Sequence, residues 1–285
     1  MINLIRFNTN FIFLNNIHYN GQYKELKCIK MRKTRIAKRL SGLGEVFTID
    51  EIRENTDLTD QALRKFIYRL KKEGWIEQIE RGKYMQLPLG EKKGEYTVNE
   101  FVIGSRLVDP HCIAYWSALH HHGFTEQIPN TVFLQTTSRK KKQQLEIFGI
   151  NYKIVRLIPE KFFGIMKERF EDTAVNITDK EKTIVDCFDK PKHCGGLIEV
   201  IKAIITEDYD SERLVDYAKR IGNTGVIRRL GFLNDYYGLD LDVPSLNKDI
   251  RNYLLLDPIM PAKGNKNSKW KLIINLDETE LEEVR

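Results

Sequence analysis

A set of long polar side chains repeats along residues 61–73, on one side of a predicted helix. The apolar positions of this segment follow the i, i+3, i+4, i+7 spacing of a helix with one buried stripe. They are Leu63, Phe66, Ile67 and Leu70. The opposite face carries Gln61, Arg64, Lys65, Tyr68 and Arg69. In the major groove of DNA, arginine forms paired hydrogen bonds to guanine and glutamine pairs with adenine. Arg64 and Gln61 are therefore candidates for reading bases.

A second cationic group lies just beyond this helix. Residues 75–79 and 83–87 are two short β-prone runs around a glycine-containing turn, which predicts a hairpin. Its tip presents Arg81 and Lys83. We expect these two residues, with Lys65 and Arg69, to contact phosphates, which supply affinity without reading sequence.

The elements that must position these residues are also visible in the sequence. Residues 32–40 predict a basic helix, and residues 49–55 predict a short second helix. Thr48 and Glu51 fit a capping box at the start of that helix, and Thr59 is a cap candidate for the next one. A solvated helix face is the alternative explanation for residues 61–69 alone. The full order of elements instead predicts a winged helix-turn-helix that binds double-stranded DNA, over residues 31–90.

The distribution of charge favours the same conclusion. The chain has a formal net charge of +6. Residues 1–30 contain four basic residues and one acidic residue, and residues 31–90 contain thirteen basic and nine acidic residues. The excess positive charge thus lies in the first ninety residues, as expected for a polyanion-binding head on a near-neutral body.

The first thirty residues allow two interpretations. Residues 1–30 lack a clean apolar region of a secretory signal, and Met31 opens a basic segment. Translation from Met31 would make them an artefact, whereas a genuine extension would pack on the body. The four cysteines, Cys28, Cys112, Cys187 and Cys194, form no regular framework. With no export signal and no apolar run long enough for a bilayer, we expect reduced thiols in a cytoplasmic protein without membrane association.

A charged, glycine-bearing stretch at residues 90–95 is the best candidate for a linker. The body after it, residues 96–285, predicts an α+β domain. Helices are predicted at residues 113–120, 179–188, 197–205, 211–221 and 226–236. Strands are predicted at residues 131–137, 152–157 and 270–276. The predicted fold is therefore an α+β chain with an N-terminal winged helix-turn-helix and a mixed α/β C-terminal domain.

Several groups in the body have residue types that could bind a metal or catalyse a reaction, but their spacing does not favour either function. His120, His121 and His122 are consecutive, so they point about 100° apart on a helix and do not converge on one metal. Cys187, His193 and Cys194 match no common zinc spacing. Asp179, Glu181, Asp186 and Asp189 form an acidic cluster. Glu181 and Asp186 fall on a predicted helix, with Asp179 at its N-terminal end, and not on the strands of a magnesium nuclease. The basic run at residues 139–142 predicts a solvated loop, with a phosphate or RNA contact as the alternative. We therefore expect no catalytic residues, metal or cofactor.

Three stretches of sequence behind the winged helix resemble the AbiEi family. They are AYWSALHHHGFTEQIP at residues 114–129, ITDKEKTIVDC at residues 177–187 running on to Pro191 and Gly195-Gly196, and RRLGFL at residues 228–233. The resemblance covers roughly residues 32–276. AbiEi proteins are the antitoxins of abortive-infection, type IV toxin–antitoxin systems.

The resemblance implies a function in phage defence. The N-terminal domain would bind inverted repeats in its own promoter and repress the operon, with a homodimer on the DNA. The C-terminal domain would counteract a partner toxin of the nucleotidyltransferase class. Two alternatives stay open: a nucleic-acid-processing enzyme targeted by its winged helix, and a transcriptional regulator whose body binds a small effector.

Overall fold

The structure is a computed structural model, and it describes residues 40, 42–87, 99–170, 172–206 and 208–284. The chain divides into two compact units, residues 1–43 and residues 44–285. The predicted extension 1–30 and linker 90–95 lie outside the described residues, as does the predicted helix over 32–40 except for its last residue. The predicted boundary between residues 90 and 96 therefore stays a prediction.

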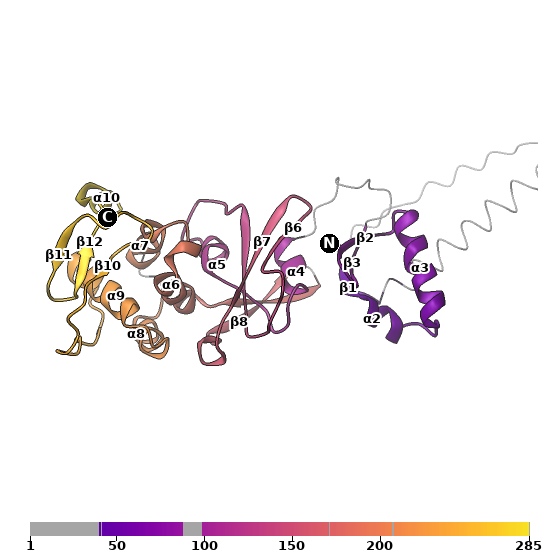
Figure 1. Cartoon of the computed structure of the whole chain (residues 1–285), viewed down its shortest axis with the longest axis horizontal. Helices are drawn as coiled ribbons and strands as arrows, with labels where there is room; N and C mark the ends of the chain where they lie inside the picture. The colour runs from indigo at the N-terminus through magenta and orange to yellow at the C-terminus, as the bar shows by residue number, and fades with distance from the viewer. Residues whose placement is uncertain (1–39, 41, 88–98, 171, 207, 285) are drawn as a thin grey trace, which may run out of the picture. The chain divides into compact units, whose positions relative to one another are not determined.

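The first elements of the second unit form a helix-turn-helix flanked by a small sheet, drawn in indigo in Figure 1. They are β1 (Val46–Thr48), α2 (Ile49–Glu54), α3 (Asp60–Lys72), β2 (Ile76–Glu80) and β3 (Lys83–Gln86). The strands pair antiparallel in the order β1-β3-β2. The predicted helices and hairpin are present, whereas β1 is an addition. With so few residues it shows no alternation, and its pairing with β3 defines it.

Local capping explains where the two helices begin. The hydroxyl of Thr48 accepts a hydrogen bond from the Glu51 amide at 3.1 Å, and the Glu51 carboxylate accepts one from the Thr48 amide at 2.6 Å. This is the predicted capping box. Thr59 caps α3 by accepting from the Ala62 amide at 3.4 Å. Such caps satisfy backbone N–H groups that have no partner inside the helix.

The body begins with α4 (Glu100–Ser105) and continues into a mixed sheet. Its strands are β4 (Cys112–Ile113), β5 (Thr131–Thr136), β6 (Gln144–Ile147), β7 (Ile150–Arg156), β8 (Ile165–Phe170) and β9 (Thr173–Thr178). They lie in the order β6-β7-β5-β4-β9-β8. The pairs β5–β7 and β4–β9 are parallel, and the other pairs are antiparallel. Helix α5 (Tyr115–His121) joins β4 to β5.

Helices follow the sheet and build most of the larger core. They are α6 (Lys180–Asp189), α7 (Leu197–Ile205), α8 (Ser211–Arg220) and α9 (Thr224–Tyr237), with the short 3₁₀ turns η1 (Pro159–Lys161) before α6 and η2 (Pro191–His193) after it. The chain ends with a small sheet and a helix: β10 (Leu254–Leu255), β11 (Asn265–Asn267), β12 (Leu272–Ile274) and α10 (Glu278–Glu283). A second apolar cluster joins the sheet to α4, and it includes Val46 and Met85 from the small N-terminal sheet.

The RRLGFL stretch has a structural role in α9. The buried guanidinium of Arg229 donates to the carbonyls of Phe188, Leu255 and Leu256. Arg228 donates to the Asn252 carbonyl at 3.0 Å. These bonds hold the strand β10 segment against the helix, because buried carbonyls need partners.

Candidate nucleic-acid interface

The five polar residues predicted on the outer face of α3 are all exposed. They are Gln61, Arg64, Lys65, Tyr68 and Arg69. Tyr68 is 70% exposed, which is unusual for a large aromatic side chain. The apolar stripe on the other side of α3, Leu63, Phe66, Ile67 and Leu70, is buried as predicted. The helix therefore presents one continuous polar face.

The cations of this face are available for an external partner. Among the residues that the structure describes, Arg64, Lys65 and Arg69 form no ion pair. The nearby acids are already engaged: Asp60 accepts from Arg53 at 3.3 Å, and Asp50 also pairs with Arg53. The exposed face is left with a positive charge that nothing on its own helix neutralises. Such a surface attracts a polyanion.

The hairpin separates the two cations predicted at its tip. Arg81 is exposed in the turn, whereas Lys83 is half-buried. The Lys83 ammonium donates to the Leu107 carbonyl at 2.9 Å and lies 3.5 Å from the Glu80 carboxylate. Burial lowers the pKa of Lys83, with Lys140 nearby adding to the effect. The predicted phosphate contact of Arg81 stays a prediction, and its side chain is exposed. A phosphate contact of Lys83 also stays a prediction, and the Leu107 carbonyl and the Glu80 carboxylate compete for its ammonium.

One lysine of the basic run at residues 139–142 makes contacts inside the protein. Lys140 pairs with Glu80 at 2.8 Å and donates to the Leu107 carbonyl at 2.7 Å. Arg106 reaches Glu51 of α2 at 3.1 Å. Lys140 is therefore a structural residue, while Lys141 and Lys142 are exposed.

The three consecutive histidines point to different partners. His120 Nδ1 lies 3.4 Å from the Thr125 carbonyl, and His122 Nε2 lies 2.7 Å from the Thr178 carbonyl. The ring of His121 packs against Phe101 and Phe170. Over the described part of the chain, no three His, Cys, Asp or Glu side chains gather in a way that could hold a metal ion. Each histidine has a local structural partner instead.

The acidic cluster of α6 is likewise divided among structural contacts. Asp179 caps the helix by accepting from the Lys182 amide at 2.8 Å. Asp186 is buried, pairs with Lys182 and accepts from Gln135 at 2.6 Å. Burial raises the pKa of Asp186 because the cost of desolvation outweighs the attraction of Lys182. The Asp186 carboxylate is therefore engaged by contacts inside the protein.

The remaining cysteines described by the structure are buried and free: Cys112, Cys187 and Cys194. Burial raises the pKa of each thiol, so these groups stay protonated and unreactive at neutral pH. Cys28 lies outside the described residues. Among the described residues, no helix is both long and apolar enough to cross a bilayer.

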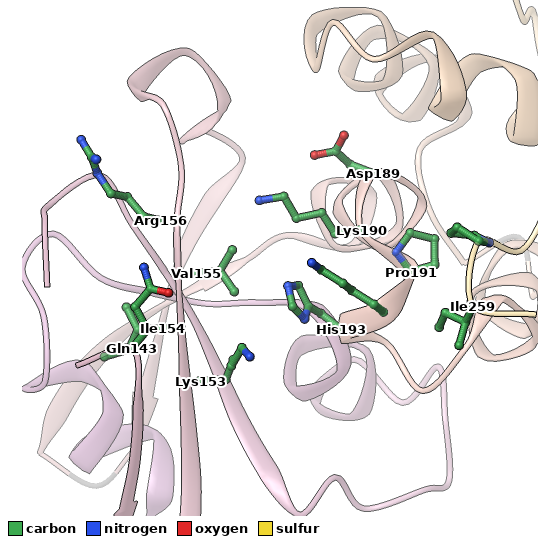
Figure 2. A pocket seen from close by; sticks show the side chains of 12 residues that line it. Gln143, Lys153, Ile154, Val155, Arg156, Asp189, Lys190, Pro191, His193 and Ile259 are labelled. Carbon is green, nitrogen blue, oxygen red and sulfur yellow. The ribbon is translucent and has the colours of Figure 1, made fainter. Parts of the chain in front are cut away.

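Sequence reasoning missed a group of cations that meet in the body. Lys153 on β7 and Lys190 and Lys192 around η2 line a common cavity with His193 (Figure 2). Lys190, Lys192 and His193 come from one short segment, whereas Lys153 lies on a strand far from it in the chain. Only the folding of η2 against β7 brings them together, so no local pattern could have identified the group.

Comparisons with known proteins give a family match in the N-terminal part of the chain and a similar fold. Residues 35–85 match the family model described as "Transcriptional regulator, AbiEi antitoxin", which confirms the resemblance drawn from the sequence. The solved structure described as "Crystal structure of RV2827C protein from Mycobacterium tuberculosis" is similar in fold, with a TM-score of 0.58 and 16% identity. That match covers 87% of this chain and 94% of the other. No curated protein matches the chain.

Proposed function

We propose that this protein binds the DNA of its own promoter and represses its operon. The proposal starts from the match of residues 35–85 to the AbiEi antitoxin regulator model. The observation that carries the proposal is the exposed face of α3, where Arg64, Lys65 and Arg69 have no ion-pair partner among the described residues. A helix of this kind enters the major groove, and the hairpin tip with Arg81 contacts the flanking phosphates. Because repeats in an operator mirror protein symmetry, two copies would bind together.

Arg64 gives the sharpest test of sequence reading. Arg64→Ala removes paired hydrogen bonds to a guanine, so binding to the promoter duplex should weaken by about 1–3 kcal/mol, with little change for a scrambled duplex. Gel-shift titrations of both duplexes measure this difference. Lys248→Ala is the matched control, because Lys248 is an exposed cation of the body. Equal losses on the two duplexes would assign Arg64 to phosphate contact, and no loss on either would remove α3 from the interface.

We also propose that the body supplies the antitoxin activity, in the cytoplasm and without catalysis, against a toxin of the nucleotidyltransferase class. The support is the family match, together with the structural contacts that occupy the α6 carboxylates. Co-expression with a toxin of this class tests this activity. The Arg64→Ala chain should still restore growth while failing to repress a promoter reporter, because the two activities use different surfaces. Loss of both activities together in a folded variant would contradict that separation.

A further inference from the structure

The body contains a cleft that the proposed DNA interface does not use. It has a volume of about 540 Å³ and is lined by β7, η2 and the segment around Ile259. A second cavity of about 440 Å³ shares Lys153, Lys192 and His193 with it, so the two meet at these residues. Figure 2 shows Lys153, Lys190 and His193 around one hollow. Volumes of this size suit a small-molecule ligand.

The charge of the cleft is positive and uncompensated. Lys153, Lys190 and Lys192 form no ion pair with any residue that the structure describes. Asp189 also lines the first cavity, but Lys161 binds its carboxylate at 3.1 Å and Asn223 donates to it at 2.6 Å. Burial lowers the pKa of Lys190, because its ammonium has lost water without gaining an ion pair. A bound anion would restore that stabilisation.

His193 lies where the two cavities meet. Only 8% of the surface of His193 is exposed. Its ring packs against Tyr115 and Phe133, at centroid distances of 5.2 and 5.5 Å. Its ring nitrogens form no hydrogen bond with the described residues, although the ring borders both cavities. Burial and the neighbouring lysines lower its pKa to about 4, so the ring is neutral at physiological pH. A neutral imidazole offers one donor and one acceptor.

Part of the lining of the first cavity is apolar. Pro191, Pro258 and Ile259 line it, and Ile259 is 51% exposed. A ligand that matches the whole cleft therefore has an anionic part, hydrogen-bonding groups and a flat or apolar part. We propose that the cleft binds a nucleotide, with its phosphates at Lys153, Lys190 and Lys192, its base or sugar against the apolar part of the lining, and a polar group at His193.

Calorimetric titration of the full chain tests this proposal. ATP and CTP are the probes, with inorganic triphosphate and adenosine as separate arms. Each nucleotide should bind more tightly than either of its parts. Lys190→Gln/Lys192→Gln should weaken nucleotide binding about tenfold or more, because it removes hydrogen bonds between charged groups. Lys167→Gln/Lys248→Gln removes two exposed body cations that do not line the cleft, and it should leave the affinity unchanged.

A second variant separates polar recognition from charge. His193→Phe keeps a ring between Tyr115 and Phe133 and removes the two nitrogens, so it should weaken binding in a protein that remains folded by circular dichroism. Arg64→Ala should bind nucleotide normally, which keeps this site distinct from the DNA interface. Absence of heat with both nucleotides, equal affinity for inorganic triphosphate, or unchanged affinity in the lysine variant would each overturn the proposal. The proposal would also be overturned if the wild type bound no nucleotide and Lys190→Gln/Lys192→Gln lost DNA or RNA binding.

Discussion

At the scale of single residues, charge alone does not identify a contact residue. Arg81 and Lys83 are two positions apart in one hairpin, and their charge predicts a phosphate contact for both. In the structure, Lys83 donates to the Leu107 carbonyl and Arg81 is exposed, so the phosphate contact of each stays a prediction. The two residues differ in position, because Arg81 lies in the turn between the strands, whereas Lys83 is the first residue of β3 and its ammonium reaches Leu107. The local sequence indicates which residue types form the interface. It does not reveal the contact between Lys83 and Leu107, because these residues are far apart in the chain.

The lowered pKa of His193 predicts how the stability of the protein depends on pH. An unfolded histidine takes up a proton near its ordinary pKa of 6.5, whereas folded His193 does so only near pH 4. The unfolded state therefore binds more protons between these values. The contribution of His193 to stability is complete above pH 6.5 and is lost as the pH falls toward 4, by about 3 kcal/mol at most.

Urea denaturation of the wild type and His193→Phe at several pH values measures this contribution. The variant should lose less stability on acidification, since it keeps the ring packing and lacks the titrating group. His111, His121 and His122 also have lowered pKa values, but they are common to both proteins and cancel in the comparison. Parallel pH curves for the two proteins would show that His193 does not titrate as described.

At the scale of elements, local patterns predicted most helices well. The helix α7 was predicted with its observed bounds, Leu197–Ile205, and α3 within one residue at each end. Both have strong apolar periodicity and clear end signals, which depend only on nearby residues. The strands β1, β4, β6, β8, β9, β10 and β11 and the helices α4 and α10 were missed. They are short or depend on distant pairing, as with β4 against β9 through Ile113 and Ile177.

The contact between α9 and the C-terminal segment gives a prediction at this scale. A Cβ on Gly231 would lie 2.2 Å from the Trp270 ring, and the ring is fixed by the bond from its Nε1 to Asp235 at 2.6 Å. Replacing glycine by alanine inside a helix ordinarily stabilises the helix by about 1 kcal/mol. Here Gly231→Ala should instead destabilise the protein, because overpacking costs typically about 1–3 kcal/mol.

Thermal and urea denaturation of Gly231→Ala test that expectation. Trp270→Phe supplies the matched background, because its smaller ring leaves room for the added methyl group. In that background Gly231→Ala should cost little or nothing further. A Gly231→Ala protein more stable than the wild type would mean that the ring does not constrain the helix.

At the scale of the whole chain, the sequence separates a basic N-terminal part from a near-neutral body, and the structure adds what this average conceals. The body is close to neutral overall, yet it concentrates Lys153, Lys190 and Lys192 in one cleft. The α+β class of the chain was predictable from its alternating patterns, whereas the strand order of the body sheet was not. Strand order depends on which distant segments pair, and no local spacing encodes that choice.

The central claim is that the outer face of α3 binds duplex DNA, and the salt dependence of binding tests it most directly. Fluorescence anisotropy of a labelled promoter duplex gives the affinity at a series of salt concentrations. For Lys65→Ala/Arg69→Ala, the slope of log affinity against log salt should be shallower by about 0.9 for each phosphate that the variant no longer neutralises. Lys248→Ala should keep the wild-type slope. Identical affinities and slopes for all three proteins would contradict the claim.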